Sequence, residues 1–331
     1  MQASFDNLRQ IVESFTGKKV LVLGDAMLDE YLWGSVSRIS PEAPVMVVDV
    51  ARTSWNPGGA ANVAANVAHL GGEAKMVAVV GDDEAADRLC REMESRGIGA
   101  EGIVRDPARP TTIKTRIIAH SQQVVRIDRE ERAPLSDAVA RQLRSVALDL
   151  VDWADAVVVS DYDKGVIPAC CAEVTQRAMG HGAPVTSNPK PNNLKLMRGG
   201  TLCSLNNSEA EAASGRKIID GESLAEAGKA VRRIAGTKWA AITRGEHGIS
   251  LFGGKGGVLE VPGIPVAVYD VAGAGDSVIA VMTLALASGA DAKHAAILAN
   301  FAGATVVRRV GVAAASQQDI LNLCKESGVH G

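Results

Sequence analysis

Residues 269–277 read YDVAGAGDS, and an apolar run, VIAVMTLALA (278–287), follows at once. Gly273, Ala274 and Gly275 let the backbone approach a ligand closely and turn into a helix. The free N–H groups of such a helix start, with the positive end of its dipole, form an anion site. Asp276 stands at this start, where it would cap the helix and place a carboxylate beside the anion. An ordinary N-cap is the simpler interpretation, so the chemical one depends on the other motifs.

Short β-branched runs alternate with stretches of helical periodicity through most of the chain. The predicted strands are residues 19–24, 74–81, 156–160, 184–187, 201–205 and 240–243. Predicted helices lie between them, for example at 58–70, 83–96, 136–149 and 222–235. This alternation predicts an α/β fold with a mainly parallel sheet covered on both faces. Ligands bind such sheets beyond the carboxyl ends of the strands.

Two segments, at about 33–52 and 111–130, read as strands without helices between them. The second contains TTIKTRIIAHSQQVVRID (111–128), which alternates apolar and polar residues around a turn predicted at SQQ (121–123). We expect a small sheet that projects as a lid from a single domain spanning residues 1–331. Its apolar face, with Ile113, Thr115 and Ile117, would need a cover. A second copy of the chain could supply it, which predicts a homodimer through the lid.

The composition limits the class of protein. The 331 residues are 47% hydrophobic and 22% charged, with a formal net charge of −3. This balance predicts no nucleic-acid partner and no membrane surface as partner, so an anion site must be local. The five cysteines form no CxxC pair and no zinc-like spacing. There is no apolar signal-peptide core, and the longest apolar helical run is too short to cross a bilayer, so we expect a cytoplasmic protein.

A second glycine motif, NPGGAAN (56–62), opens a predicted helix of small residues. Gly58 and Gly59 would allow a ligand to approach the backbone at the helix start. Asn62, one turn into the helix, offers a donor and an acceptor to a sugar hydroxyl. The alternative is a helix start packed closely by alanines.

Charged residues follow two of the predicted strands. Asp25 and Asp29 come after the first strand and suit vicinal hydroxyl groups, and SDYDKG (160–165) forms a second cluster. No Walker A motif occurs, and no GxGxxG follows the first strand. The sequence therefore argues against a P-loop enzyme and against a dinucleotide oxidoreductase.

Together, Asn-Pro-Gly-Gly-x-x-Asn (56–62) and Asp-x-x-Gly-Ala-Gly-Asp (270–276) resemble the two signatures of the PfkB carbohydrate kinases, which have the ribokinase-like fold. The motifs occur in the same order as in that family, and the match covers essentially the whole chain. GDAMLDEYLWG (24–34), RISPEAPV (38–45), the segment 114–128 and SDYDKG more closely resemble the D-glycero-β-D-manno-heptose 7-phosphate kinases of lipopolysaccharide core synthesis. That resemblance implies ATP-dependent phosphorylation at C1 to give the 1,7-bisphosphate.

The resemblance also implies roles for individual residues. Asp276 matches the catalytic base, and the amides of Ala274, Gly275 and Asp276 match the anion hole that follows Gly273. Asn206 and Glu209, in Asn-x-x-Glu, match residues that organise Mg²⁺. The nucleotide side comprises Asn188, Lys190, Asn206, Thr243, Gly245 and Asn300. Asp29, Asn62 and Asp161 match residues that bind sugar hydroxyls, and the motifs described above add Asp25, Gly58 and Gly59 to the sugar side. Apart from the resemblance, the lid and a strand end carry polar residues that could hold the phosphate of a sugar phosphate: Lys114, Arg116, Gln123, Arg126 and Lys164. Alternation places Lys114 and Arg116 on one face, where both could bind it, and solvated surface charge is the alternative.

Some positions depart from the family pattern and leave alternatives open. Ala272 and Ser277 stand where many members have Thr, and the hydroxyl that Ala272 lacks weakens the case for a monovalent cation near Asp270. Asn188 stands where the heptose kinases often have Asp. A kinase of another sugar or sugar phosphate is one alternative, and a non-catalytic sugar or nucleotide sensor is another. Because related kinases are often fused to a nucleotidyltransferase, a chain ending at Gly331 is expected to leave the next step to another protein.

Overall fold

A nine-stranded sheet forms the body of the computed structural model, which describes residues 4–120, 122–254, 257–309, 311 and 313–328. Its strand order is β13-β12-β11-β10-β9-β8-β1-β4-β5. The strands are β1 (Lys19–Gly24), β4 (Glu73–Val80), β5 (Ile98–Arg105), β8 (Ala156–Ser160), β9 (Val185–Asn188), β10 (Leu202–Asn206), β11 (Trp239–Thr243), β12 (Ile249–Gly253) and β13 (Val258–Val261). Neighbours from β5 to β11 are parallel, and β12 and β13 pair antiparallel at one edge. The predicted mainly parallel sheet is confirmed.

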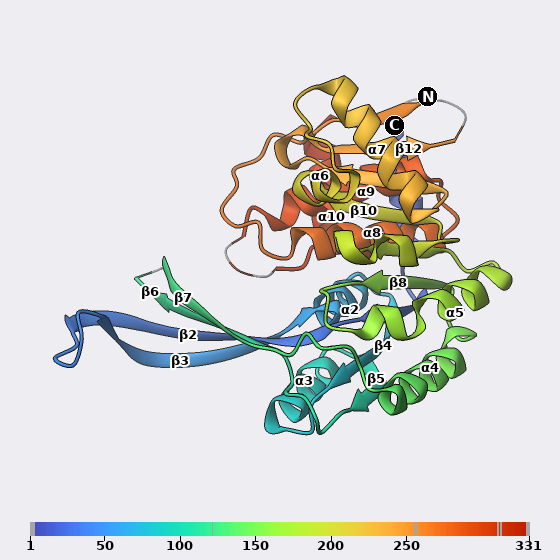
Figure 1. Ribbon diagram of the computed structural model, residues 1–331. Helices are drawn as coiled ribbons and strands as arrows, with labels where there is room; N and C mark the ends of the chain where they lie inside the picture. The colour runs from blue at the N-terminus through green and yellow to red at the C-terminus, as the bar shows by residue number, and fades with distance from the viewer. Residues whose placement is uncertain (1–3, 121, 255–256, 310, 312, 329–331) are drawn as a thin grey trace.

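Helices cover both faces of this sheet (Figure 1). One hydrophobic core packs α1 (Phe5–Glu13), α2 (Ala60–His69), α3 (Glu84–Glu94), α8 (Ala274–Ala287), α9 (Ala292–Val306) and α10 (Gln317–Glu326) against the sheet. The other packs α4 (Asp137–Val151), α5 (Val166–Gly180), α6 (Asn207–Ser214), α7 (Gly221–Ala235) and the 3₁₀ turn η1 (Pro191–Met197). A second 3₁₀ turn, η2 (Gly245–His247), follows β11. Helix α8 is buried from Asp276 to Ala285, which explains why its apolar residues do not alternate with polar ones. Among the described residues, no helix combines the length and apolar character needed to cross a membrane.

A four-stranded sheet, β3-β2-β6-β7, projects from the body (Figure 1). It consists of β2 (Ala26–Ile39), β3 (Met46–Gly59), β6 (Ile113–Ala119) and β7 (Gln122–Arg129). These strands form the predicted lid, but β2 starts at Ala26 and β3 ends at Gly59, so together they extend beyond both ends of the predicted segment 33–52. Strand β2 starts two residues after β1 ends, and β3 ends at Gly59, the N-cap of α2. Of the turn predicted at 121–123, residue 121 lies outside the described residues, and Gln122 and Gln123 already belong to β7.

The two faces of the lid differ in chemistry. Thr115 lies opposite Ile127, and Ile117 lies opposite Val125, so these side chains share one face with Ile113. We call this set the apolar lid face. Lys114, Arg116, Arg126 and Asp128 share the other face, which we call the polar lid face. Val125 and Ile127 are 44% and 55% exposed, so much of the apolar lid face has no cover within the chain.

Candidate active site

Polar residues gather where neighbouring strands of the large sheet end. Gly24 lies opposite Ser160, Ser160 lies opposite Asn188, and Asn206 lies opposite Thr243. Because the loops after these strands start at the same edge, they bring the residues predicted for the sugar and nucleotide sides to one place.

Helix α8 begins at this edge with the Gly-Ala-Gly turn. Gly273 is the N-cap, with a left-handed φ of +77° that favours glycine. The N–H of Ala274 is donated back to the carbonyl oxygen of Val271 at 3.3 Å. Helix geometry leaves the N–H groups of Gly275 and Asp276 without an intrahelical acceptor, as an anion site requires. The expected capping role of Asp276 is wrong, because Asp276 is the third helical residue and its side chain turns to other partners.

The Asp276 carboxylate is buried and accepts two hydrogen bonds. Its Oδ2 accepts from Asn62 Nδ2 at 2.7 Å, and its Oδ1 accepts from the Tyr162 hydroxyl at 2.8 Å. Burial raises the pKa of Asp276 to about 6, although both hydrogen bonds oppose the shift. The nearby Asp29 raises this pKa further, and Lys190 lowers it. A carboxylate with a pKa close to neutrality suits a general base.

Asn62 is held in place by the packing of α2 against α8. Its backbone oxygen accepts from Asn66 Nδ2 at 2.8 Å, and Asn66 Oδ1 accepts from Ser277 Oγ at 2.6 Å. All three side chains are buried. The amide nitrogen of Asn62, predicted to face a sugar hydroxyl, thus points at the candidate base.

Gly58 and Gly59 serve close packing between the end of β3 and β2. A Cβ on Gly58 would lie 2.5 Å from Asp29 Oδ2, and one on Gly59 would lie 2.6 Å from the carbonyl oxygen of Asp25. Gly59 also has a left-handed φ of +57°. The sequence suggested room for a ligand here, whereas the structure uses the space for strand β2.

Asp25 and Asp161, two of the carboxylates predicted for the sugar, accept hydrogen bonds from groups of the protein. Asp25 accepts backbone N–H bonds from Tyr162, Lys164 and Val166, and burial raises its pKa to about 6. Asp161 accepts from the Lys190 N–H at 2.8 Å and from the side-chain amide of Asn193, and burial raises its pKa too. Both carboxylates fix the loops that follow β8 and β9.

Carboxylates also face each of the cations predicted to hold the phosphate of the sugar. Arg116 Nη1 lies 2.6 Å from Asp29 Oδ1, and Arg126 Nε lies 2.9 Å from Asp128 Oδ1. Lys114 Nζ lies 2.8 Å from Asp128 Oδ2. Gln123 is exposed on β7.

Glu130 joins the lid to the body at this point. Lys164 Nζ lies 2.9 Å from Glu130 Oε2, and Lys114 Nζ lies 3.4 Å from the same atom. Although partial burial opposes ionisation, hydrogen bonds from Lys164 and Arg132 lower the pKa of Glu130 to about 2. The structure therefore brings Lys114 and Lys164 together around one ionised carboxylate.

The residues predicted for Mg²⁺ form a reciprocal cap at the start of α6. Asn206 Oδ1 accepts from the Glu209 N–H at 2.9 Å, and Glu209 Oε2 accepts from the Asn206 N–H at 3.1 Å. The other oxygen of Glu209 lies 2.7 Å from Lys190 Nζ. Thr243 ends β11, and Gly245 follows with a left-handed φ of +57°.

Asn188 ends β9, and Asn207 is the first residue of α6, next to Asn206. Asn188 Oδ1 and Asn207 Oδ1 are buried without a hydrogen-bond partner. Mg²⁺ prefers oxygen ligands and usually keeps several waters. Within the described ranges, no group of three or more His, Cys, Asp or Glu could hold a metal by itself. The side-chain oxygens of Asn206 and Glu209 are of the kind that Mg²⁺ prefers, so these two residues fit a metal held through its waters.

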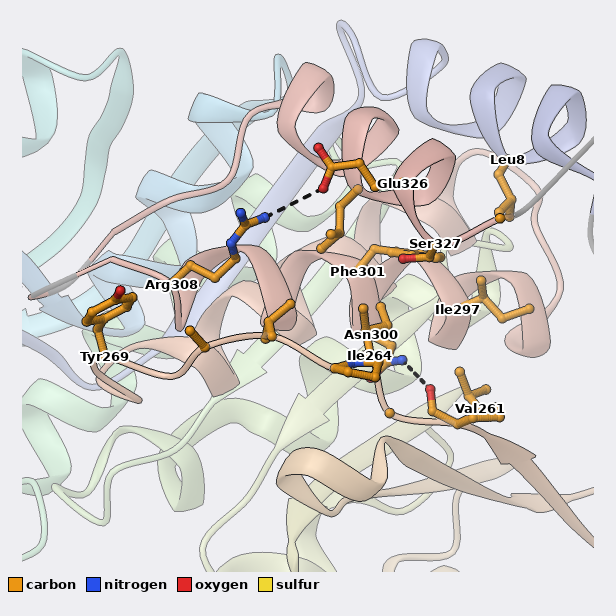
Figure 2. Close-up of a pocket in the computed structure, with 17 residues that line it drawn as sticks. Leu8, Val261, Ile264, Tyr269, Ile297, Asn300, Phe301, Arg308, Glu326 and Ser327 are labelled. Atoms are coloured by element: carbon orange, nitrogen blue, oxygen red, sulfur yellow. Dashed lines mark hydrogen bonds and ion pairs between the residues drawn. The ribbon is translucent and has the colours of Figure 1, made fainter.

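A cavity of about 1130 Å³ lies between residues 261–269, α9 and α10 (Figure 2). Ile264, Ile297 and Phe301 contribute apolar wall, and Asn300 Nδ2 donates to the Pro262 carbonyl oxygen at 2.8 Å. The chain continues from this wall through Tyr269 to the start of α8. The cavity is large enough for a planar base, and Asn300, predicted to lie near adenine, lines it.

Sequence reasoning missed two residues of the site. Tyr162 stands within SDYDKG, between Asp161 and Lys164, and only its position after a strand end could have drawn notice. Glu130 falls at the last position of the predicted lid segment. Neither sequence pattern indicates which side chain each residue contacts.

The sequence and the fold are similar to those of known proteins. The model of the "pfkB family carbohydrate kinase" matches residues 17–319. The "Bifunctional protein HldE" of Trichlorobacter lovleyi is 42% identical over 318 residues, which are 95% of this chain and 65% of that protein. The protein of the same name from Geobacter sulfurreducens is 44% identical over 302 residues, which are 91% of this chain and 62% of that protein. The chain thus spans somewhat less than two thirds of these relatives.

Solved structures share the fold at low sequence identity. Phosphofructokinase-2 from Escherichia coli in complex with potassium has a TM-score of 0.77 at 19% identity, covering 94% of this chain and 99% of that chain. Ribokinase from Arabidopsis thaliana complexed with ribose and ATP has a TM-score of 0.72 at 20% identity, with the same coverage. The expected ribokinase-like fold is confirmed.

Proposed function

Since this chain belongs to the pfkB family of carbohydrate kinases, we propose that it transfers the γ-phosphoryl group of ATP to C1 of D-glycero-β-D-manno-heptose 7-phosphate. The buried Asp276 beside the amides at the start of α8 carries the catalytic part of the proposal. Similarity to the HldE proteins supports a heptose-phosphate kinase role. The cations of the polar lid face support a phosphorylated substrate.

The proposed reaction follows from the chemistry of these groups. A sugar hydroxyl is a weak nucleophile, so Asp276 accepts its proton while the oxygen bonds to the γ-phosphorus of ATP. The bond from that phosphorus to the β-phosphate oxygen breaks, and ADP leaves. The N–H groups of Gly275 and Asp276 stabilise the negative charge on the transferring group.

The nucleotide would lie along the strand ends from the cavity to α8. Adenine would occupy the apolar cavity beside Asn300, and the phosphates would pass Thr243, Gly245 and Lys190. Asn206 and Glu209 would hold Mg²⁺ through its waters, and the metal would neutralise charge on the phosphates.

A direct test measures ATP turnover against a panel of sugars and sugar phosphates. The position of the new phosphate is then assigned by phosphorus NMR. We expect turnover with the heptose 7-phosphate and a new phosphate on C1. A preference for another sugar would overturn the substrate, and failure of every sugar to release ADP would favour a non-catalytic sensor.

Glu209→Gln should raise the magnesium concentration needed for half-maximal turnover by on the order of 10-fold, because it removes a carboxylate that orders the metal's waters. The KM for the sugar phosphate should change little. Glu211→Gln is a matched control, because Glu211 lies on the same helix and pairs with Lys217. A magnesium titration that overlays that of the unmodified protein would remove Glu209 from the site.

We also propose that the chain is a homodimer through the apolar lid face. Ile39, Val45, Met46 and Val50 near the tip of the lid are 49–60% exposed, so they add to the uncovered apolar surface. Light scattering at micromolar concentration should report a dimer, and Ile127→Asp should make it a monomer. Ile219→Asp, at an 85% exposed residue between α6 and α7, should leave the dimer intact. A monomeric unmodified protein would contradict the proposal.

A further inference from the structure

Tyr162 donates a hydrogen bond to the candidate base Asp276 and takes no direct part in the proposed phosphoryl transfer. We infer that Tyr162 is a positioning residue whose hydroxyl orients the Asp276 carboxylate, while its ring supports Lys190 on the nucleotide side. The inference deepens the proposed function and rests on it, because it presumes that Asp276 is the base.

The loop after β8 fixes the backbone of Tyr162. Its N–H donates to Asp25 Oδ2 at 2.8 Å, and Asp25 is only 2% exposed. The same carboxylate accepts from Lys164 and Val166, so one buried anion ties down the whole turn. Burial raises the pKa of Tyr162 well above its usual range, and the adjacent Asp276 raises it further. The phenol therefore stays protonated and donates its hydrogen to Asp276.

The two donors to Asp276 come from different elements and reach different oxygens. Asn62, on α2, donates to Oδ2, and Tyr162, in the β8–α5 loop, donates to Oδ1. Together they prevent the carboxylate from rotating about its Cβ–Cγ bond. Each oxygen keeps a second lone pair, because an ionised carboxylate has about four acceptor sites. The carboxylate therefore already has a fixed orientation when the sugar hydroxyl binds.

The same two hydrogen bonds lower the pKa of Asp276 and so favour its ionised form at neutral pH. The charged groups that face Asp276 are Asp29, from β2, which favours its protonation, and Lys190, from the loop after β9, which favours its ionisation. The negative charges of Asp29 and Glu209 also raise the pKa of Tyr162. Since burial already favours the protonated acid, removing the tyrosine hydroxyl should raise the pKa of Asp276 further.

The ring of Tyr162 makes a separate contact. Lys190 Nζ lies 5.4 Å from the ring centroid and 2.7 Å from Glu209 Oε1. A cation over an aromatic face is held by the ring's quadrupole. The hydroxyl therefore serves the sugar-side base, and the ring serves the nucleotide-side lysine, so the two contacts can be removed separately.

Two variants separate these contacts. Tyr162→Phe keeps the ring and deletes the hydroxyl, and Tyr162→Leu deletes both. For Tyr162→Phe, the acid limb of the kcat/KM profile should move up by about one to two pH units, because a hydrogen bond to a charged group is lost. At pH 7 this lowers kcat/KM by about 2- to 10-fold, with the KM for ATP unchanged. Tyr162→Leu should show the same displaced limb and also a raised KM for ATP.

Thr283→Val is the matched control. It removes a buried hydroxyl from α8, the helix that carries Asp276, where Thr283 Oγ1 lies 2.6 Å from Thr186 Oγ1, away from the strand-end site. It should lower the melting temperature and leave the acid limb in place. If Tyr162→Phe overlays the unmodified protein in its pH profile, the positioning role is overturned.

A second measurement does not depend on activity. In the full chain labelled with ¹³C-aspartate, the signal of Asp276, assigned with Asp276→Asn, should titrate at higher pH in Tyr162→Phe. An unmoved titration would overturn the inference even if the kinase is active. Should heptose 7-phosphate prove not to be a substrate, the proposed function fails while this titration still decides the role of Tyr162.

Discussion

Asp276→Asn should lower kcat by about 10²–10⁴-fold, the range expected when a general base is removed. The fold and the affinity for the sugar phosphate should be nearly unchanged, because Asn matches Asp in size. The hydrogen bonds can also be satisfied again, since the Asn oxygen can accept from Asn62 and its NH₂ can donate to the Tyr162 oxygen. Turnover by ADP release and binding by calorimetry would measure the two effects separately. Near-normal turnover would show that another group takes the proton.

The same variant should be more stable than the unmodified protein at pH 7–8. Burial raises the pKa of Asp276 to about 6, above its usual 3.8, so the folded state binds more protons than the unfolded state between these values. Stability contributed by this group therefore falls as the pH rises from about 4 to 6. Asn removes that loss, so the melting temperature should rise at pH 7–8 and change little at pH 4. Asp152→Asn should act in the opposite direction at pH 7, because Arg177 lowers the pKa of Asp152. A lower melting temperature of Asp276→Asn at pH 8 would contradict this reasoning.

The double variant Lys114→Ala/Arg116→Ala should reduce kcat/KM roughly 100-fold or more for phosphorylated sugars. The same sugars without phosphate should lose far less. Each charge-assisted hydrogen bond contributes about 1.5–3 kcal/mol. Asp29, Asp128 and Glu130 already pair with these cations, so a bound phosphate would replace a carboxylate as their partner. The net free energy contributed by each contact should therefore lie at the lower end of that range. Part of the loss should appear in kcat, since holding the remote phosphate also positions the reacting hydroxyl.

Arg129→Ala is the control for the loss of a lid cation. Arg129 lies opposite Ile113 on β7, is 61% exposed in its side chain and approaches Asp83 at 3.7 Å. Its removal should leave the ratio of kcat/KM for phosphorylated sugars to kcat/KM for unphosphorylated sugars unchanged. Equal losses for phosphorylated and unphosphorylated sugars in the double variant would mean that Lys114 and Arg116 only stabilise the lid. The phosphate pocket would then have to lie at Arg126 and Lys164.

Local pattern was sufficient to predict the sheet and the start of α8. The alternation of strands and helices requires only neighbouring residues, and the Gly-Ala-Gly turn with the apolar run after it places the anion site. The contacts of Asp276 could not be predicted in this way. Tyr162 and Asn62 lie 114 and 214 residues from it in the chain, and their side chains meet only after the sheet has formed.

The pairing of the lid cations shows a second limit. A symmetric turn at 121–123 would place Lys114 opposite Glu130. In the structure Ala119 pairs with Gln122, so the turn lies closer to β6 than predicted, and after a register shift between Ile117 and Ile118 Lys114 lies opposite Asp128. Asp25 shows a third limit, because a carboxylate after a strand end can bind either a ligand or the amides of the next loop. Only the observed path of residues 162–166 reveals which of these occurs.

The continuity of β2 and β3 limits how the lid can be exchanged between relatives in protein engineering. Each strand runs from the tip of the lid to the base of the active site, where Asp29 and Gly58 are in close approach. Replacing the whole of both strands would therefore change the residues of the candidate sugar site together with the lid. The register shift between Trp33 and Gly34 is a better junction for a chimera. On the active-site side of it, residues 26–33 of β2 pair with residues 52–59 of β3 without a further shift. A chimera that transplants only residues 34–50 should change the proposed dimer interface while preserving the candidate base and its contacts.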